Sequence, residues 1–264
     1  MSSLERAGRR RPIRFGELGR ANREPTTPTM RVVAPLVHRV MRIWTRATWL
    51  GGQHIPQSGP AIIVANHISS LDPPLLGEYL AMHGRWPHFL ARANLFDGPI
   101  LGRGLRGVEQ IPVLRGSSQA RDALRHAERA LGRGQVVVLY PEGTITFDPD
   151  EWPMAGHTGA ARLALRTGAP VIPVGQWGAN FALPPRKIHR FRLRRWPITI
   201  VAGAPLDLSE FEGDAEDRLV TRAVTNRIMA GITAMAEQAR GEAAPPDRWH
   251  QRKGYRVPPD QAVI

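Results

Sequence analysis

The amino-acid sequence predicts an α/β fold, a single domain in which helices flank a largely parallel central sheet. Short apolar runs such as residues 61–65 and 136–139 alternate with stretches of helical periodicity along the chain. Each run is too short for a helix and has turn residues on both sides, which is typical of buried strands. Polar residues directly follow several of these runs, and in α/β folds the loops at the carboxyl ends of strands carry the chemistry.

The chain of 264 residues is strongly basic, with a formal net charge of +13 that is almost all arginine. Residues 1–30 are rich in Arg, Thr and Pro and show no apolar period, so we expect a disordered basic arm. Such an arm suits an anionic partner, either nucleic acid or an acidic membrane surface. We expect no signal peptide, and no run approaches the roughly 20 apolar residues of a spanning helix.

Residues 31–49 predict an amphipathic helix. Val33, Val37 and Ile43 recur at helical spacing, and arginines lie between them. Basic residues together with tryptophan favour a helix that lies in a membrane interface. Packing of this helix on the domain core is an equally open alternative.

Beyond residue 60 the predicted strands and helices alternate. The expected strands cover residues 61–65, 88–92, 110–113, 136–139, 171–174 and 198–202. The expected helices cover residues 73–82, 118–131, 159–167 and 215–240. Residues 31–240 would then form the folded domain, and the Pro-rich, charged residues 241–264 would form a flexible tail.

The loop at residues 66–72 places a base and a carboxylate close together. Asp72 precedes a proline, an arrangement typical of a helix start, so it could simply begin the next helix. It could also accept a hydrogen bond from one ring nitrogen of His67 and fix the tautomer. The other ring nitrogen would then be free to take a proton. The two interpretations are compatible.

Two further loops carry polar groups at the ends of predicted strands. Gly143 and Thr144 offer backbone N–H groups and a hydroxyl that suit a phosphate, and Glu142 beside them could bind substrate hydroxyls. Arg115 could hold a phosphate through two parallel hydrogen bonds. A plain turn and a solvated arginine are the structural alternatives at these positions.

Taken together, four ordered blocks resemble the glycerophospholipid acyltransferase family, and within it the bacterial 1-acyl-glycerol-3-phosphate acyltransferases. The blocks are Asn66-His67-x-Ser69-x-x-Asp72, Ile111-Pro112-Val113-x-Arg115, Pro141-Glu142-Gly143-Thr144 and Val171-Ile172-Pro173-Val174. Each lies on a predicted strand or at its end. The fold that the resemblance implies is glycerol-3-phosphate acyltransferase-like.

The resemblance implies transfer of a fatty acyl chain from acyl-CoA or acyl carrier protein to a lysophospholipid, with 1-acyl-glycerol-3-phosphate giving phosphatidic acid. In this reaction His67 would be the general base, and Asp72 would orient it. The residues that would hold the acceptor are Arg115, Glu142, Gly143 and Thr144. Neither a metal nor a cofactor beyond the acyl donor is expected, and the chain has no cysteine that could form an acyl-enzyme.

The sequence departs from the family pattern at two positions. Ile145 stands where the family usually has arginine, and His157 stands where lysine is common. These departures leave another lyso-lipid, glycerol 3-phosphate or a non-phosphate alcohol open as the acceptor, unless Arg92 or another arginine compensates.

We expect a peripheral protein on the cytoplasmic face of the cell membrane, with an anionic membrane surface as its partner. The basic segment 186–196, with interleaved aromatic residues, leaves a nucleic-acid groove as the weaker alternative. A non-catalytic basic protein that binds membrane or nucleic acid is the rival from another class.

Overall fold

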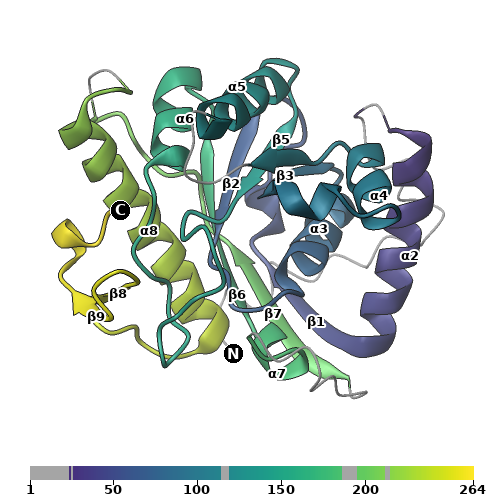
Figure 1. Cartoon of the computed structure of the whole chain (residues 1–264). Helices are drawn as coiled ribbons and strands as arrows, with labels where there is room; N and C mark the ends of the chain where they lie inside the picture. The colour runs from purple at the N-terminus through teal and green to yellow at the C-terminus, as the bar shows by residue number, and fades with distance from the viewer. Residues whose placement is uncertain (1–23, 25, 114–118, 186–194, 212–214) are drawn as a thin grey trace.

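A seven-stranded sheet forms the centre of the computed structural model, which describes residues 24, 26–113, 119–185, 195–211 and 215–264 (Figure 1). The strand order is β1-β7-β6-β2-β5-β3-β4. The strands are β1 (Thr45–Leu50), β2 (Ala61–Ala65), β3 (Pro87–Arg92), β4 (Ile111–Val113), β5 (Val136–Leu139), β6 (Val171–Trp177) and β7 (Trp196–Ala202). Strands β2 to β6 run parallel to one another, and β7 pairs antiparallel with β6. The predicted α/β fold with a largely parallel sheet is therefore confirmed.

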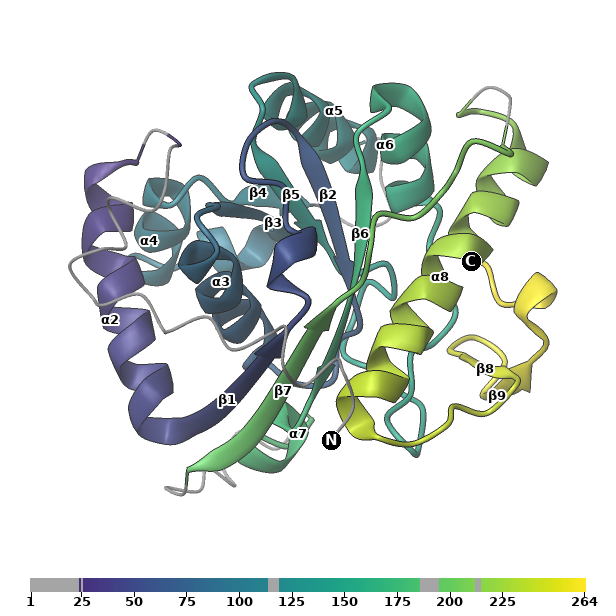
Figure 2. The same cartoon turned by 180° about the vertical axis from the view of Figure 1, so that it is seen from behind.

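Helices cover both faces of the sheet (Figure 2). One face carries α2 (Pro28–Trp44) and α3 (Asp72–Met82). The other carries α5 (Gln119–Gly132), α6 (Gly159–Thr167) and α8 (Arg218–Arg240). The shorter helices are α4 (Leu101–Gly107), which lies beside α2, and α7 (Ala179–Ala182), which follows β6.

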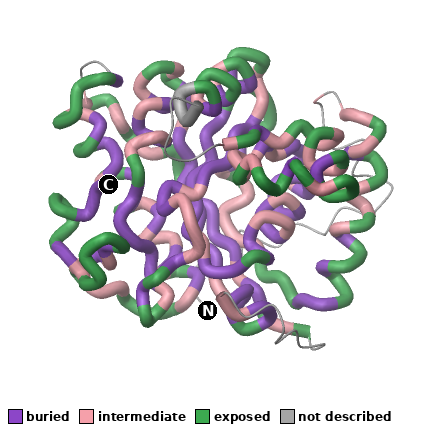
Figure 3. The backbone as a smooth tube through the Cα atoms, viewed as in Figure 1, coloured by how far each residue is buried: buried purple, intermediate pink, exposed green. Residues whose placement is uncertain are grey.

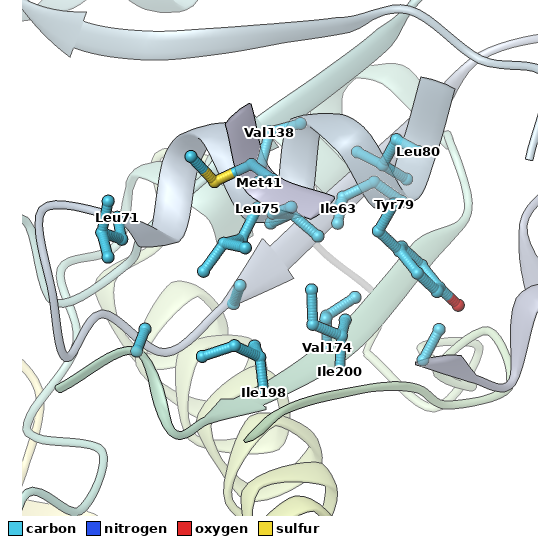
Figure 4. Close-up of a cluster of buried hydrophobic side chains, with 14 of the residues drawn as sticks. Met41, Ile63, Leu71, Leu75, Tyr79, Leu80, Val138, Val174, Ile198 and Ile200 are labelled. Atoms are coloured by element: carbon cyan, nitrogen blue, oxygen red, sulfur yellow. The ribbon is translucent and has the colours of Figure 1, made fainter. Parts of the chain in front are cut away.

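Strand β2 lies at the middle of this arrangement, and all of its residues are fully buried (Figure 3). Ile63 packs with Leu75 and Tyr79 of α3 on one face (Figure 4). Ile62 and Val64 belong to the core under α5, α6 and α8. Because side chains alternate along a strand, a strand covered on both faces reads as an uninterrupted apolar run.

Helix α2 differs from the helix predicted over residues 31–49. It begins at Pro28, where the Thr27 side chain accepts a hydrogen bond from the Met30 N–H at 3.1 Å. It ends at Trp44, and residues 45–50 pair with β7 as strand β1. The prediction was wrong at its C-terminal end because pairing with a distant strand overrides local periodicity.

The C-terminal residues 241–264 form ordered structure in place of the predicted flexible tail. They contain the hairpin of β8 (Arg248–His250) and β9 (Tyr255–Val257). Val257 and Ala262 are buried against Ala155. Composition alone could not show these tertiary contacts.

The predicted basic arm, residues 1–30, lies mostly outside the described residues. Within the described part of the chain, no helix combines the length and apolar character that crossing a bilayer requires.

Glu24, from the N-terminal region, neutralises a fully buried guanidinium. The Arg85 side chain has no solvent exposure, and its Nε donates to Glu24 Oε1 at 2.5 Å. Its other nitrogens donate to the carbonyls of Pro56, Gly59 and Gly134. The second Glu24 oxygen accepts from the Trp86 N–H at 3.0 Å.

Replacing Glu24 with alanine should destabilise the fold by about 3 kcal/mol, because it leaves a buried charge without a counter-ion. Chemical denaturation of wild type and Glu24→Ala measures this loss. Asp122→Ala is the matched control, since Asp122 and Arg125 form an exposed pair at 3.7 Å. That control should lose less than about 1 kcal/mol. Equal losses in the two variants would contradict the assigned role of Glu24.

Candidate active site

The candidate site lies at one edge of the sheet, where neighbouring parallel strands end. His67 follows β2, and residues 140–144 follow the adjacent strand β5. Arg92 ends β3, the next strand along. Parallel strands place their carboxyl ends at the same edge, so segments far apart in the sequence meet there.

His67 and Asp72 form a hydrogen-bonded pair, with Nδ1 of His67 2.8 Å from Oδ2 of Asp72. Asp72 is fully buried as the first residue of α3, and the same oxygen accepts from the Ile68 and Ser69 N–H groups at 2.6 and 2.8 Å. An ionised carboxylate only accepts, so Nδ1 of His67 carries the proton in this arrangement. The other ring nitrogen, Nε2, is then left as a base.

The 66–72 loop is held from several sides, through both side chains and backbone. Asn66 exchanges two hydrogen bonds with the Gln176 backbone in β6, at 2.7 and 3.0 Å. The His67 carbonyl accepts from the Thr146 N–H at 2.8 Å. The Ser69 hydroxyl donates to the Leu183 carbonyl at 2.8 Å. A histidine held this firmly would need little reorganisation to act as a base.

The His67 ring is positioned by an aromatic neighbour as well. It stacks on Tyr140, with ring centroids 4.3 Å apart and planes 20° from parallel. Desolvation raises the pKa of the Tyr140 hydroxyl well above its ordinary value, so this ring remains neutral beside the dyad. The His67 side chain keeps 16% exposure, which leaves an edge open to a substrate.

Glu142 does not have the role that the sequence suggested. It is 1% exposed, and its Oε1 accepts from the His67 N–H at 2.9 Å. Its Oε2 accepts from the Met154 N–H at 3.0 Å. With both oxygens bound to backbone, Glu142 holds the His67 loop and the 146–154 loop together and is not placed to contact an acceptor.

The neighbouring predicted residues lie nearer the protein surface. The Thr144 hydroxyl accepts from Nη2 of Arg92 at 3.2 Å, in an exposed contact. Gly143 adopts φ of 70°, and a Cβ there would come within 3.0 Å of the His157 ring. His157 therefore lies beside Gly143 at this edge of the sheet. Arg115 lies outside the described residues.

Sequence reasoning missed Thr146, Gln176 and Leu183, which hold the loop through long-range contacts. No local pattern marks these residues, because their partners lie far away in the sequence. Among the described residues, no three His, Asp or Glu side chains are grouped as metal ligands.

Burial raises the pKa of Glu142 to about 8, from an ordinary value of 4.5. A raised pKa means that the folded state favours the protonated form. The stability from Glu142 is fully present below pH 4.5 and is lost as the pH rises through about 8. Relative to Glu142→Gln, wild type should therefore lose free energy of unfolding across this range.

Denaturant titrations of both proteins from acidic to mildly alkaline pH measure this difference. Glu128→Gln, at a surface pair with Arg166, is the control and should follow the wild-type profile. Parallel profiles for wild type and Glu142→Gln would contradict the assignment.

Comparison with known proteins indicates a family for this chain. Residues 47–177 match the family model described as Acyltransferase. An uncharacterized protein of Mycobacterium tuberculosis is 27% identical over 236 residues, covering 76% of this chain and 63% of that protein. The lyso-ornithine lipid O-acyltransferase of Pseudomonas aeruginosa is 30% identical over 148 residues, covering 54% of this chain and 55% of that enzyme.

The fold also matches a crystal structure, that of the 1-acyl-sn-glycerophosphate (LPA) acyltransferase PlsC from Thermotoga maritima. The TM-score is 0.59 at 23% identity, covering 82% of this chain and 81% of that one. The present chain spans less than two thirds of the length of the mycobacterial relative. Residues 47–177, which include β2 with its His67 loop and β5 with its 141–144 turn, therefore belong to the acyltransferase family.

Proposed function

We propose that this acyltransferase moves a fatty acyl chain from acyl-CoA or acyl carrier protein to the hydroxyl of a lysophospholipid. The observation that carries the proposal is the His67–Asp72 dyad. Nδ1 of His67 is bound to Asp72 at 2.8 Å, and Nε2 has no hydrogen-bond partner within the described part of the chain. A histidine held in this way suits proton abstraction from an alcohol.

In the proposed reaction, Nε2 of His67 takes the proton of the acceptor hydroxyl as its oxygen attacks the thioester carbonyl. The buried carboxylate of Asp72 stabilises the imidazolium that forms. Collapse of the tetrahedral intermediate breaks the carbon–sulfur bond, and the imidazolium proton passes to the departing thiolate. The products are the ester and a free thiol.

The burial and hydrogen bonding of Ser69, the residue with a hydroxyl beside the dyad, support direct transfer of the acyl chain from donor to acceptor. Ser69 is fully buried, its hydroxyl donates to the Leu183 carbonyl, and it accepts from the Leu71 N–H. A serine bound in this way is not available as a nucleophile, and the chain has no cysteine. The proposal therefore contains no acyl-enzyme.

For the acceptor we propose 1-acyl-glycerol-3-phosphate, giving phosphatidic acid. Arg92 supports this choice, because its guanidinium reaches Thr144 at the edge of the site and could meet a phosphate. A second candidate is a lyso-lipid with a different head group. The relative from Pseudomonas aeruginosa is named for one such acceptor, lyso-ornithine lipid. Ile145 and His157 favour it, since neither is a permanent cation.

Purified protein supplied with acyl-CoA and lysophosphatidate should release free CoA, which a thiol reagent measures. His67→Ala should lower kcat by at least about 10²-fold because the general base is removed. Asp72→Asn should lower it by a comparable factor, through the wrong tautomer. His54→Ala, a histidine on a different loop, should keep wild-type activity.

The outcomes separate the candidates. An active His67→Ala would refute the mechanism. Release of thiol with lyso-ornithine lipid and none with lysophosphatidate would refute only the acceptor. Salt-sensitive binding of nucleic acid, without turnover of any lyso-lipid, would favour a non-catalytic binding protein.

We also propose that the protein docks on the anionic cytoplasmic surface of the cell membrane through α2. One face of this helix is apolar and exposed, with Val32, Leu36 and Ile43 all at least 60% exposed. Exposed arginines stand beside this stripe, which suits an interfacial helix. Ile100, which precedes α4, is a further exposed apolar residue, at 86% exposure.

The double substitution Leu36→Asp and Ile43→Asp should weaken binding to vesicles of phosphatidylcholine and phosphatidylglycerol by about 10²-fold, because two apolar contacts are lost and negative charge is added. Sedimentation with vesicles measures this change. Leu219→Asp, at a leucine on α8 that is 79% exposed, is the control and should bind as wild type does. Equal binding by all three proteins would refute docking through α2.

A further inference from the structure

We infer that Arg240, at the C-terminal end of α8, is a positioning residue for the proposed base His67. The inference rests on the proposed function. The Arg240 guanidinium lies between two indole rings, with Cζ 4.1 Å from the centroid of Trp152 and 4.0 Å from that of Trp177. Its Nη1 donates to the Asp150 carbonyl at 2.6 Å, and its side chain is only 11% exposed.

The two rings belong to the two segments that hold the His67 loop. Trp177 directly follows Gln176, whose backbone exchanges two hydrogen bonds with Asn66. On the other side, the Trp152 carbonyl accepts from the Thr146 hydroxyl at 2.9 Å. The Thr146 N–H in turn donates to the His67 carbonyl at 2.8 Å. A single guanidinium therefore joins both supports of the loop.

The segment that Arg240 holds is strained, and this makes an outside anchor necessary. Glu151, between Asp150 and Trp152, has φ of 62°, in the left-handed region that side chains rarely adopt. Such a backbone persists only where its surroundings fix it. Arg256 adds a second anchor on the same loop by bonding Asp148 through two nitrogens, at 2.8 and 2.9 Å.

Arg240 also contacts Glu242, with Nη2 2.9 Å from a carboxylate oxygen that belongs to a largely exposed side chain. Stacking between two rings while donating to a carbonyl requires a planar, multiply donating cation, which arginine provides and lysine does not. Arg240 lies outside residues 47–177, which match the family model, so this support comes from a part of the chain beyond that match.

Loss of Arg240 should displace the base without removing it. We expect Arg240→Leu to lower kcat by about 10²-fold, the effect of a displacement of roughly 1 Å at the reacting groups. KM for acyl-CoA should stay within about twofold, because the change acts on the base and leaves donor binding intact. Arg240→Lys keeps a cation between the rings, so its kcat should be about tenfold higher than that of Arg240→Leu.

Hydrogen exchange provides a readout that is independent of activity. In Arg240→Leu the amides of residues 146–154 should exchange at least about tenfold faster, since local opening becomes easier, while those of β2 and β5 stay unchanged. Arg252→Leu removes an exposed arginine from the same C-terminal segment and should match wild type in both measurements.

Wild-type kcat in Arg240→Leu, or unchanged exchange in residues 146–154, would overturn the inference. So would an equal effect of Arg252→Leu. If Arg240→Leu does not fold, the same comparison is made with Arg240→Lys, which should show a smaller loss of kcat and faster exchange at the same amides. A wild-type protein that turns over no acceptor would refute the proposed function, and the exchange result would still test the contact itself.

Discussion

The carboxylate of Asp72 is the group on which the rest of the site depends. One of its oxygens receives three hydrogen bonds, from the His67 ring and from the Ile68 and Ser69 N–H groups. The residue is also the first of α3, where the N–H groups of the helix favour a negative charge. Burying a carboxylate without such donors would cost several kcal/mol. The compensating contacts therefore fix the loop and the imidazole together.

The parallel sheet explains how so short a loop is held so firmly. Its neighbours at the carboxyl edge come from the ends of β5 and β6, far away in the sequence. Glu142 approaches from one side and accepts from the His67 N–H, and the Gln176 side-chain amide approaches from the other and donates to the Asn66 carbonyl. Because these supports belong to different strands, displacement of the base requires breaking hydrogen bonds to at least two of them.

The parts that the sequence predicted correctly have local causes. Strands β2 and β5 are uninterrupted apolar runs between turns, and the His67–Asp72 spacing is contained in one loop. The predictions that were wrong concern residues whose structure is set by contacts with residues far away in the sequence. Residues 45–49 look helical in isolation, but they pair with β7. The role of Glu142 depends on the Met154 N–H, which reaches it only after the 146–154 loop folds back.

The structure also separates the buried polar groups of this site from those at its surface. Three of the four side-chain oxygens of Asp72 and Glu142 accept from internal donors, and the fourth, Oδ1 of Asp72, is buried, so neither side chain faces the surface. Arg92 and Thr144, from neighbouring strand ends, meet at an exposed contact. In the described part of the chain, neither residue is hydrogen-bonded to His67 or Asp72. In the proposed reaction, a substitution at Arg92 or Thr144 would therefore alter head-group preference and leave the hydrogen bond between His67 and Asp72 intact.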